Sequence, residues 1–376
     1  MCEELQLEII RDIDRLISLS HEWDALDAIH SFRIPFTSAC WNILWWQHLR
    51  STSLLRRNEL HTFALRNTSG ELVAIAPMSI SILPGMGMFD IRILQFLGAD
   101  PNLTEVRGLL CRPEYADQAM AAIQIYLAQH KQQWDWVEWP NLTQSQADQH
   151  ASFDTLACSP RPMYYLPLPA TWDTLKAGLS RNMKEALRKC TNSLKRANIT
   201  HDFRIISSAE ETPFALQTFF RLHALRSKIN NTVPHANAFS EDKSQQFLSA
   251  YAQAMAAKNC LRIFQIVIND EVVATRIGLI CGRHLYLYYS GYDIAWGRYS
   301  IMTKLVVRTI QWAIAQSFEC VNLSTGNDYS KLRWQPQVLW TYSAVQLSPR
   351  LRAAPLFRIY KQLRGYKIAH RLSHST

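Results

Sequence analysis

The sequence predicts an α/β (α+β) protein built from two units of similar architecture, each a mixed, mostly antiparallel sheet flanked by helices. Three alternating runs at 261–268, 272–281 and 284–291 are joined by tight polar connections, which is the pattern of an antiparallel meander. From residue 300 the apolar residues recur at helical spacing, and a short buried strand follows at 320–323. The first half of the chain shows the same order of elements, which predicts the second unit.

The expected elements follow in order along the chain. In the first half we expect a strand at 5–10, helices at 12–29 and 38–50, strands at 60–66, 71–82 and 90–97, a helix at 114–131 and a strand at 134–139. In the second half we expect a helix at 172–198, a strand at 202–207, helices at 212–229 and 240–257, the meander, a helix at 300–317 and the strand at 320–323. Four prolines interrupt regular structure between 155 and 172. We therefore expect units at 1–165 and 166–349, followed by a basic helix within 350–376.

Composition narrows the class of protein. Hydrophobic residues make up 48% of the 376 residues, which is enough for buried cores. The N-terminus lacks the basic segment of a signal peptide, and no apolar run reaches the ~18–20 residues that span a bilayer. The eight cysteines form no CxxC pair and no disulfide framework, so free thiols in the cytoplasm are the simplest interpretation. Zinc-ligand spacings and HExxH are absent, which disfavours a metal cofactor, and the sequence also lacks GxSxG and a Walker loop.

Positive charge is concentrated in two predicted helices. The formal net charge is +9, and six basic residues with one acid lie in 181–196, while seven basic residues with no acid lie in 350–376. A nucleic-acid partner is disfavoured, because such proteins spread their charge over one face of a domain. The helix near 172–198 either exposes a solvated face or contacts an anionic group, a nucleotide phosphate or a lipid-linked sugar. The amphipathic helix near 353–371 either packs on the body or makes a weak contact with an anionic membrane surface.

Several short motifs occur in a characteristic order in the second half. They are Leu222-His223 with Arg226, Val273-Ala274, Tyr288 to Tyr292, Trp296 with Tyr299-Ser300, and Gly326-Asn327-Asp328 with Lys331 and Trp334. This order resembles the GNAT acyltransferase superfamily, in particular the CelD-type branch of cellulose and exopolysaccharide biosynthesis, which is related to the Fem peptidoglycan transferases. The resemblance covers about 170–345 well and 1–165 more weakly. It implies a cytoplasmic acyltransferase, peripheral to the inner face of the membrane, that takes acetyl-CoA or another acyl-CoA as co-substrate and a sugar or polysaccharide precursor as acceptor.

Acyl transfer from a thioester needs a phosphate site, donors that polarise the carbonyl, a base and an acid. The resemblance places the donor at two segments: Tyr289, Ser290 and Gly291, and the loop that leads into the next helix with Arg298, Tyr299, Ser300 and Lys304. Ser300 is of the N-cap type, and a helix N-terminus binds phosphate. Ser290-Gly291 permits a β-bulge.

The remaining roles fall on residues around the same cleft. Asp328 is the candidate base, or else an aspartate that closes a turn. His223 and Arg226 share a helix face, so His223 is a base, a substrate contact or a structural histidine, and Arg226 is a substrate contact. Tyr292 and Tyr329 are candidate acids for the leaving thiolate, or packing residues. Lys331 pairs with Asp328 or binds a carboxylated sugar. In the first unit, Asp100, Glu105 and Arg107 either shape an acceptor cleft or belong to an ordinary loop.

One departure from the branch bears on the donor. The loop ends in Ser300-Ile301-Met302, where the branch has Ser-Pro-Gly, and the missing glycine removes the easiest close approach of backbone to phosphate. A Fem-like, aminoacyl-tRNA-dependent transferase therefore stays an alternative, as does a non-catalytic subunit of a polysaccharide-synthesis complex.

Overall fold

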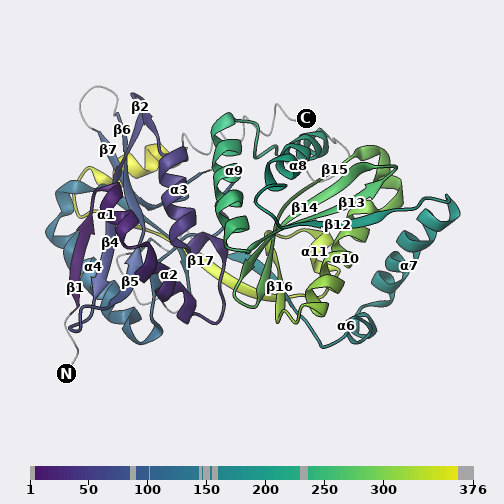
Figure 1. Ribbon diagram of the computed structural model, residues 1–376. Helices are drawn as coiled ribbons and strands as arrows, with labels where there is room; N and C mark the ends of the chain where they lie inside the picture. Colours follow the sequence, from purple (N-terminus) through teal and green to yellow (C-terminus); the bar gives the residue numbers. More distant parts are fainter. Residues whose placement is uncertain are drawn as a thin grey trace.

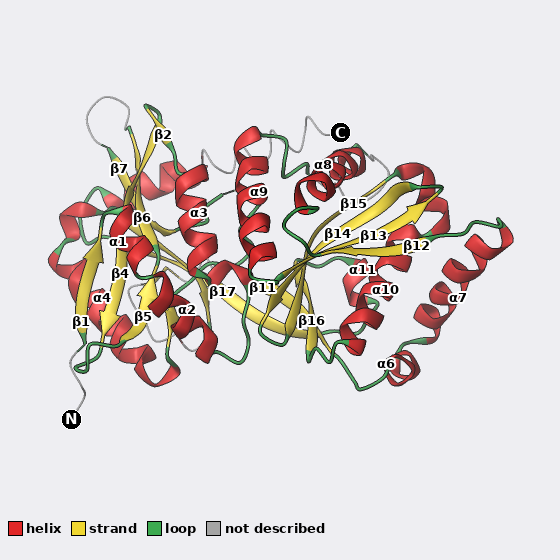
Figure 2. Ribbon diagram, in the orientation of Figure 1, coloured by secondary structure: helices red, strands yellow, loops and turns green. Residues whose placement is uncertain are grey.

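A computed structural model describes residues 5–84, 90–100, 102–143, 146, 153–154, 160–228 and 236–362. In the view of Figure 1, the first half of the chain lies on the left and most of the second half lies on the right. Helices cover the sheets in both halves (Figure 2). No helix in these described ranges is long and apolar enough to cross a bilayer.

The first half carries nine strands and four α-helices in its described residues. In chain order they are β1 (Gln6–Ile10), α1 (Ile13–Ser18), α2 (Ser20–Ile29), α3 (Ala39–Leu49), β2 (Thr52–Ser53), β3 (Arg56–Leu60), β4 (Thr62–Arg66), β5 (Leu72–Ala76), β6 (Met78–Leu83), β7 (Ile91–Phe96), β8 (Leu110–Cys111), α4 (Ala116–Gln129) and β9 (Trp136–Leu142). A four-stranded sheet has the order β1-β4-β5-β8, and the other five strands join a larger sheet.

The second half supplies the rest of that larger sheet. Its elements are β10 (Phe153–Asp154), β11 (Arg161–Pro167), α6 (Trp172–Gly178), α7 (Arg181–Arg196), β12 (Asp202–Ile206), α8 (Thr212–Ser227), α9 (Asp242–Ala257), β13 (Leu261–Ile268), β14 (Glu271–Cys281), β15 (His284–Tyr292), α10 (Ile301–Ala315), β16 (Cys320–Thr325), α11 (Tyr329–Leu332) and β17 (Gln337–Leu347). The meander, the helix and the strand that the sequence predicts correspond to β13 to β15, α10 and β16.

Strand β17 joins the two halves into one 13-stranded sheet of order β12-β13-β14-β15-β16-β11-β17-β9-β7-β6-β3-β2, with β10 paired to β17 off this path. The first part of β17 pairs with β11, from Gln337 to Thr341, and its second part pairs with β9, from Tyr342 to Leu347. The division at 165/166 stays a prediction, but the backbone hydrogen bonding continues from one unit to the other.

Three predicted elements are each divided in two. The expected strand at 71–82 is interrupted at Pro77, which has no N–H to donate, so β5 and β6 belong to different sheets. The helix expected at 12–29 is divided at Leu19. The helix expected at 172–198 is divided between α6 and α7, where Ser180 caps the second helix. Conversely, Pro162 and Pro167 lie within β11 rather than in irregular chain.

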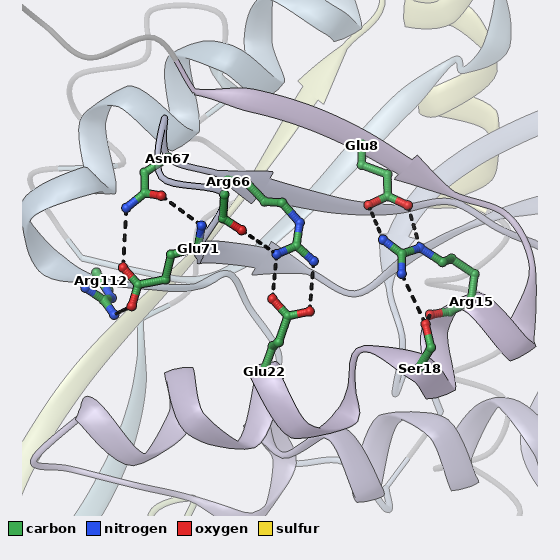
Figure 3. A network of polar contacts seen from close by, with 9 residues as sticks. Glu8, Arg15, Ser18, Glu22, Arg66, Asn67, Glu71 and Arg112 are labelled. Carbon is green, nitrogen blue, oxygen red and sulfur yellow. Dashed lines mark hydrogen bonds and ion pairs between the residues drawn. The ribbon is translucent and has the colours of Figure 1, made fainter.

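Ion pairs fasten the small sheet to its covering helices (Figure 3). Arg15 of α1 pairs with Glu8 of β1 at 2.7 Å, and Arg66 of β4 makes a two-point pair with Glu22 of α2 at 2.5 and 2.9 Å. Arg112 pairs with Glu71, beside the turn at 67–70. These contacts lie near the surface, where such pairs contribute little stability, so their role is to fix orientation.

The chain returns to the first unit after β17. Residues 353–362 are helical, and this segment lies against the first unit (Figure 1). The rings of Phe357 and Tyr360 contact Trp136 at centroid distances of 5.4 and 5.1 Å. These aromatic side chains therefore pack on the body, as one of the two sequence interpretations proposes. The predicted part of this helix beyond 362 lies outside the described residues.

Candidate active site

The strands β15 and β16 separate to form a fork. They pair in parallel only from His284↔Cys320 to Tyr286↔Asn322, and both strands continue beyond these pairs. Between Arg276↔Ser290 and Gly278↔Leu287, two residues of β15, Tyr288 and Tyr289, face one residue of β14. The bulge thus lies at Tyr288 and Tyr289, just before the Ser290-Gly291 pair that the sequence marks as permissive for one, and it falls in the part of β15 that lies beyond its pairs with β16.

Gly291 lets helix α8 pack closely against strand β15. A Cβ at this position would lie well inside 3.0 Å of the backbone of Leu222 and His223 in α8. The helix therefore touches the strand at the fork, which brings His223 and Arg226 to it.

His223 is buried and satisfied on both ring nitrogens. Its Nδ1 lies 2.9 Å from the carbonyl oxygen of Ser290, and its Nε2 accepts from the backbone N–H of Ala238 at 3.3 Å. This pattern places the ring proton on Nδ1. Burial lowers the pKa of His223, so the neutral ring is favoured. A role as base would require one of these two hydrogen bonds to open.

Three cationic side chains gather at the fork. Arg226 donates to the Ser290 hydroxyl at 2.7 Å, Arg276 projects from β14 opposite Ser290, and Lys331 donates to the carbonyl oxygen of Thr325. Burial is the first cause that lowers the pKa of each, that of Arg276 to about 10. Within the described ranges, the buried Nε of Arg276 has no hydrogen-bond partner. A buried guanidinium nitrogen of this kind favours an anionic or strongly polarised ligand atom beside it.

Glu105 of the first unit reaches into the fork and is the carboxylate that binds both of its arms. Its Oε2 accepts from the hydroxyl of Tyr286 at 2.5 Å, from the hydroxyl of Ser324 at 2.6 Å and from the N–H of Thr325 at 3.2 Å. All of these bonds go to Oε2, so in the described part of the chain Oε1 is open to other partners. The charge of Glu105 partly offsets the burial that lowers the pKa of Lys331 and of Arg276.

The loop that carries Glu105 also accepts hydrogen bonds from the two tyrosines of the β15 bulge. The Tyr288 hydroxyl donates to the carbonyl oxygen of Leu103 at 2.6 Å, and the Tyr289 hydroxyl donates to that of Asn102. Burial raises the pKa of Tyr289, so this phenol stays protonated. Both hydroxyls therefore act as donors that hold the two units together at the fork.

Asp328 caps the short helix α11. Its side chain accepts from the N–H of Ser330 at 2.8 Å, which is the turn-closing arrangement that was one of its two interpretations. Its negative charge partly offsets the burial that lowers the pKa of Arg226, Arg276 and Lys331. Of the two candidate acids, Tyr329 is 75% exposed, whereas Tyr292 is half-buried at the end of β15.

The predicted phosphate loop lies at the start of α10. Residues Ile294–Tyr299 form a 3₁₀ turn, and Ser300 occupies the N-cap position with φ 55° and ψ 41°. Ser300 takes the left-handed conformation that glycine adopts readily, and its side chain makes no cap hydrogen bond. Arg298 lies over the ring of Tyr299 at 4.8 Å. Burial lowers the pKa of Lys304, and the nearby Arg308 and Lys195 lower it further.

A cavity of about 310 Å³ opens beside the fork, between the two units. Glu105 and Thr325 belong to both the fork and the cavity. Asn141 lines it with φ 60°, at a bulge where Pro140 and Asn141 of β9 face a single residue of β17. The other lining residues are Val106, Arg107, Glu138, Trp139, Pro140, Arg161, Thr341, Ser343, Ala344 and Val345. Non-glycine residues with positive φ and bulges recur beside active sites, so this wall is a candidate binding surface.

The structure brings part of the predicted set together. Arg226, Ser290, Asp328 and Lys331 meet at the fork, and the residues Arg298 to Lys304 form a second group at the start of α10. Sequence reasoning missed Arg276, whose signal was an arginine inside the apolar run VVATRIGLIC. It missed Tyr286 as well, and it left Glu105 undecided, because only the packing of the units places Glu105 against β15 and β16.

Comparisons with known proteins bear on the fold and on the second half of the chain. The family model described as an acetyltransferase (GNAT) domain matches residues 181–334. The crystal structure of FemX is similar, with a TM-score of 0.61 at 10% identity over 90% of this chain and 98% of that one. The C-terminal domain of a putative lysylphosphatidylglycerol synthetase from Agrobacterium fabrum gives 0.51 at 10% identity, over 91% and 96% of the two chains. L-PGS from Bacillus licheniformis gives 0.51 at 11% identity, over 92% and 95%.

No curated protein matches the sequence. At such low identities, the similar structures establish the fold alone. That fold extends over both halves of the chain, and the family match falls on the half that contains the fork. Residues 181–334 thus match the acetyltransferase (GNAT) domain model, and the chain as a whole shares the fold of the FemX structure, with helices flanking the sheets of both halves as the sequence predicts.

Proposed function

We propose that this protein is an acyltransferase that moves an acetyl group from acetyl-CoA to an amino or hydroxyl group of a sugar or of an exopolysaccharide or cell-envelope precursor, as the CelD-type resemblance implies. The observation that carries the proposal is the fork between β15 and β16, which holds three desolvated cations and a carboxylate from the other unit. A reacting carbonyl in the fork would meet Arg276 and Lys331. Charge that develops on its oxygen would be stabilised there without reorganising solvent.

The acceptor would occupy the cavity between the units. Its wall offers carboxylates at Glu105 and Glu138, arginines at 107 and 161, and hydroxyl or amide groups at Thr325, Thr341, Ser343 and Asn141. A few convergent polar groups in a cavity of this size suit a polyhydroxylated or amino-bearing molecule. The cavity meets the fork at Glu105 and Thr325, so an acceptor bound there would reach the donor carbonyl.

Glu105 is the base that this arrangement favours, because its Oε1 is open while Oε2 is fixed. It would accept the proton as the acceptor's nitrogen or oxygen attacks the thioester carbon. The tetrahedral intermediate would then collapse, breaking the carbon–sulfur bond, and Tyr292 would protonate the departing thiolate. Asp328, the base that the sequence suggested, would in this scheme hold the cations in place.

An aminoacyl-tRNA-dependent transferase is the second candidate. Two observations favour it: the fold is shared with FemX over 90% of this chain, and Ser300-Ile301-Met302 stands where the branch has a glycine-containing loop. In that case the fork would polarise an ester carbonyl rather than a thioester.

Substitution of the two carboxylates tests the chemistry. We expect Glu105→Gln to lower the rate of acetyl transfer to a panel of amino sugars at least about tenfold, measured as release of free CoA thiol. Asp328→Asn is expected to lower it about tenfold as well, through the loss of charge beside Lys331. Glu319→Gln, at the other end of β16, is the matched control and should retain the wild-type rate.

Wild-type turnover in Glu105→Gln would reject Glu105 as the base. A wild-type protein that neither binds acetyl-CoA in calorimetry nor releases thiol would reject the donor.

A further inference from the structure

The hairpin of β2 and β3 exposes two leucines at its tip. The pairing of Ser53 with Arg56 leaves Leu54 and Leu55 as a two-residue turn. Leu54 is 96% exposed and Leu55 is 82% exposed. Two-residue hairpin turns ordinarily use glycine, asparagine or aspartate, because these residues adopt the turn conformations readily. Leucines contribute no packing at this position, and a partner outside the chain would explain them.

The tip is held in place by the strands behind it. The Ser51 N–H donates to Oδ1 of Asn58 at 2.7 Å, and the Ser51 hydroxyl donates to the carbonyl oxygen of Arg56 at 2.7 Å. The Nε of Arg56 in turn donates to the hydroxyl of Ser81 in β6 at 2.8 Å. The backbone of β3 also pairs with that of β6. The two leucines therefore project from a hydrogen-bonded hairpin rather than from an irregular loop.

A third exposed leucine lies beyond the same end of the sheet. One row of backbone partners crosses the ends of β3, β6, β7, β9 and β17, and it consists of Arg57, Ile82, Arg92, Asp135 and Ser348. Strand β3 runs from this row into the sheet, whereas β17 ends just before it. The tip leucines before β3 and Leu351 after β17 therefore both lie outside the row, roughly 20 Å apart across four strand spacings. Leu351 is 99% exposed. In Figure 1 the hairpin and the last helical segment both lie in the upper left.

Positive charge surrounds these leucines. Residues 50–60 carry three basic residues and one acid, and residues 350–362 carry four basic residues and no acid. The acid, Glu59, pairs with Arg57 at 3.3 Å, which leaves a net positive charge on the hairpin. On the last helical segment, Arg358 is exposed. The surface therefore combines protruding apolar side chains with cations.

An anionic membrane matches this pattern better than a protein does. The core of a protein interface is an apolar patch from which charged residues are depleted. Here the apolar side chains protrude at points roughly 20 Å apart and have arginines beside them. Protruding apolar side chains flanked by cations suit the headgroup region of an anionic leaflet, where the apolar groups enter the lipid and the cations meet the phosphates.

We propose that the β2–β3 hairpin inserts Leu54 and Leu55 into the interfacial region of an anionic membrane, with Leu351 as a second point of contact. This surface is separate from the cavity beside the fork, whose described lining residues include none of these leucines. It does not depend on the proposed acyl transfer either, because binding to lipid requires neither donor nor acceptor. The last helical segment follows Leu351, so a membrane contact of that segment would add to this one.

The test compares the exposed tip with an exposed apolar residue elsewhere. Leu54→Ser with Leu55→Ser removes the hairpin leucines, and Leu351→Ser removes the second point of contact. Phe214→Ser is the matched control, because Phe214 is 72% exposed near the start of α8 in the second unit. All four side chains are exposed, so the variants should fold, which circular dichroism checks.

Two measurements are made on the full chain and on each variant. Sedimentation with vesicles of phosphatidylcholine, alone or mixed with phosphatidylglycerol, measures binding to lipid. Sedimentation velocity without lipid measures the oligomeric state.

We expect the wild type to bind the phosphatidylglycerol vesicles at least about tenfold more tightly than the phosphatidylcholine vesicles, because the surface is basic. The double hairpin variant should bind the anionic vesicles at least about tenfold more weakly than the wild type, because both inserted side chains are lost. Leu351→Ser should weaken binding about threefold, and Phe214→Ser should stay within about twofold of the wild type.

Four outcomes overturn the inference. In the first, the wild type binds neither kind of vesicle. In the second, the double hairpin variant binds anionic vesicles as well as the wild type, which leaves any lipid contact to residues 350–376. In the third, the hairpin and Phe214 variants lose binding equally, which shows a general effect of exposed apolar surface. In the fourth, the wild type forms an oligomer that the hairpin variant loses, which makes the tip an interface between copies of this chain.

Discussion

Gly291 shows at the scale of one residue how the fork is positioned. Its missing side chain lets the backbone of α8 touch β15, and this contact delivers His223 and Arg226 to Ser290. The family resemblance places Gly291 in a donor site. In the structure, its contribution is the short distance between a helix and a strand.

We therefore expect Gly291→Ala to destabilise the protein by about 1–3 kcal/mol, because the new methyl group would overlap the backbone of Leu222 and His223. Urea unfolding followed by circular dichroism measures this change. Gly178→Ala at the end of α6 is the control, since a Cβ added there would have no atom within 4 Å and alanine favours the helix. Equal stability of the two variants would contradict the packing role.

His61 gives the first unit a specific pH dependence. Burial, helped by Arg11 and His130, lowers its pKa from 6.5 to about 4. Between these values the unfolded chain binds a proton and the folded chain does not, so stability is full above pH 6.5 and falls as the pH drops. From about pH 7 to about pH 5 this loss amounts to about 2 kcal/mol.

We expect His61→Leu to remove that part of the pH dependence. The difference between the free energies of unfolding at about pH 7 and about pH 5 should shrink by about 2 kcal/mol relative to the wild type. Denaturation at the two pH values measures it, whatever the variant does to stability at neutral pH. An unchanged difference would show that another group is responsible.

At the scale of elements, the segment after β17 is held by a buried carboxylate. Asp135 precedes β9 and is fully buried, and it accepts from Arg352 at 2.9 and 3.2 Å and from the N–H of Arg92 at 2.9 Å. Arg350 adds a contact at 3.5 Å. These bonds align the last helical segment so that Phe357 and Tyr360 meet Trp136.

Arg352→Met should cost about 3 kcal/mol, because it leaves the buried charge of Asp135 without its main partner. Thermal or urea unfolding tests this expectation. Arg358→Met, at an exposed arginine of the same segment, is the matched control and should change stability by less than about 0.5 kcal/mol. A small effect at both positions would mean that Asp135 has another partner that compensates its charge.

A contact between residues 350–376 and anionic membranes is a separate proposal. Sedimentation with anionic liposomes, with and without this segment, is the test.

At the scale of the whole molecule, β17 makes one body of two units. It pairs with β11 of the second unit and β9 of the first, and Glu105 adds a side-chain link at the fork. The proposed catalysis depends on this arrangement, because the cavity has walls from both units. Neither unit alone contains the complete candidate site.

We expect the two units to unfold together. Tryptophan fluorescence is weighted toward the first unit, where Trp134, Trp136 and Trp139 are buried, whereas far-UV circular dichroism reports both units. The two signals should give the same urea midpoint, because loss of β17 breaks the sheet in both halves. Separate midpoints would show that the units are independent and that the shared strand contributes little coupling.

The sequence by itself determined most of the order of elements, and it pointed to the half of the chain that matches the acetyltransferase (GNAT) domain model. Its alternating runs locate β13 to β15, and its helical spacing locates α10, because local periodicity reflects which side chains face a core. It also singled out four of the residues that lie at the fork, since Ser290, Asp328 and Lys331 belong to short motifs near the ends of β15 and β16, and Arg226 belongs to a motif in α8. It did not predict β17, which lies after the last predicted strand, or the break at Pro77 that sends β5 and β6 to different sheets.

Only the tertiary structure decided which groups share a site. Glu105 reaches Tyr286 and Ser324 across more than 180 residues of chain, and no local pattern encodes such a contact. Arg276 looks like an isolated charge in the sequence and becomes significant because α8, α11 and the loop of Glu105 surround it. Local patterns specify helices and strands through short-range sterics and burial, whereas a site made of side chains from distant elements depends on how whole sheets pack and join.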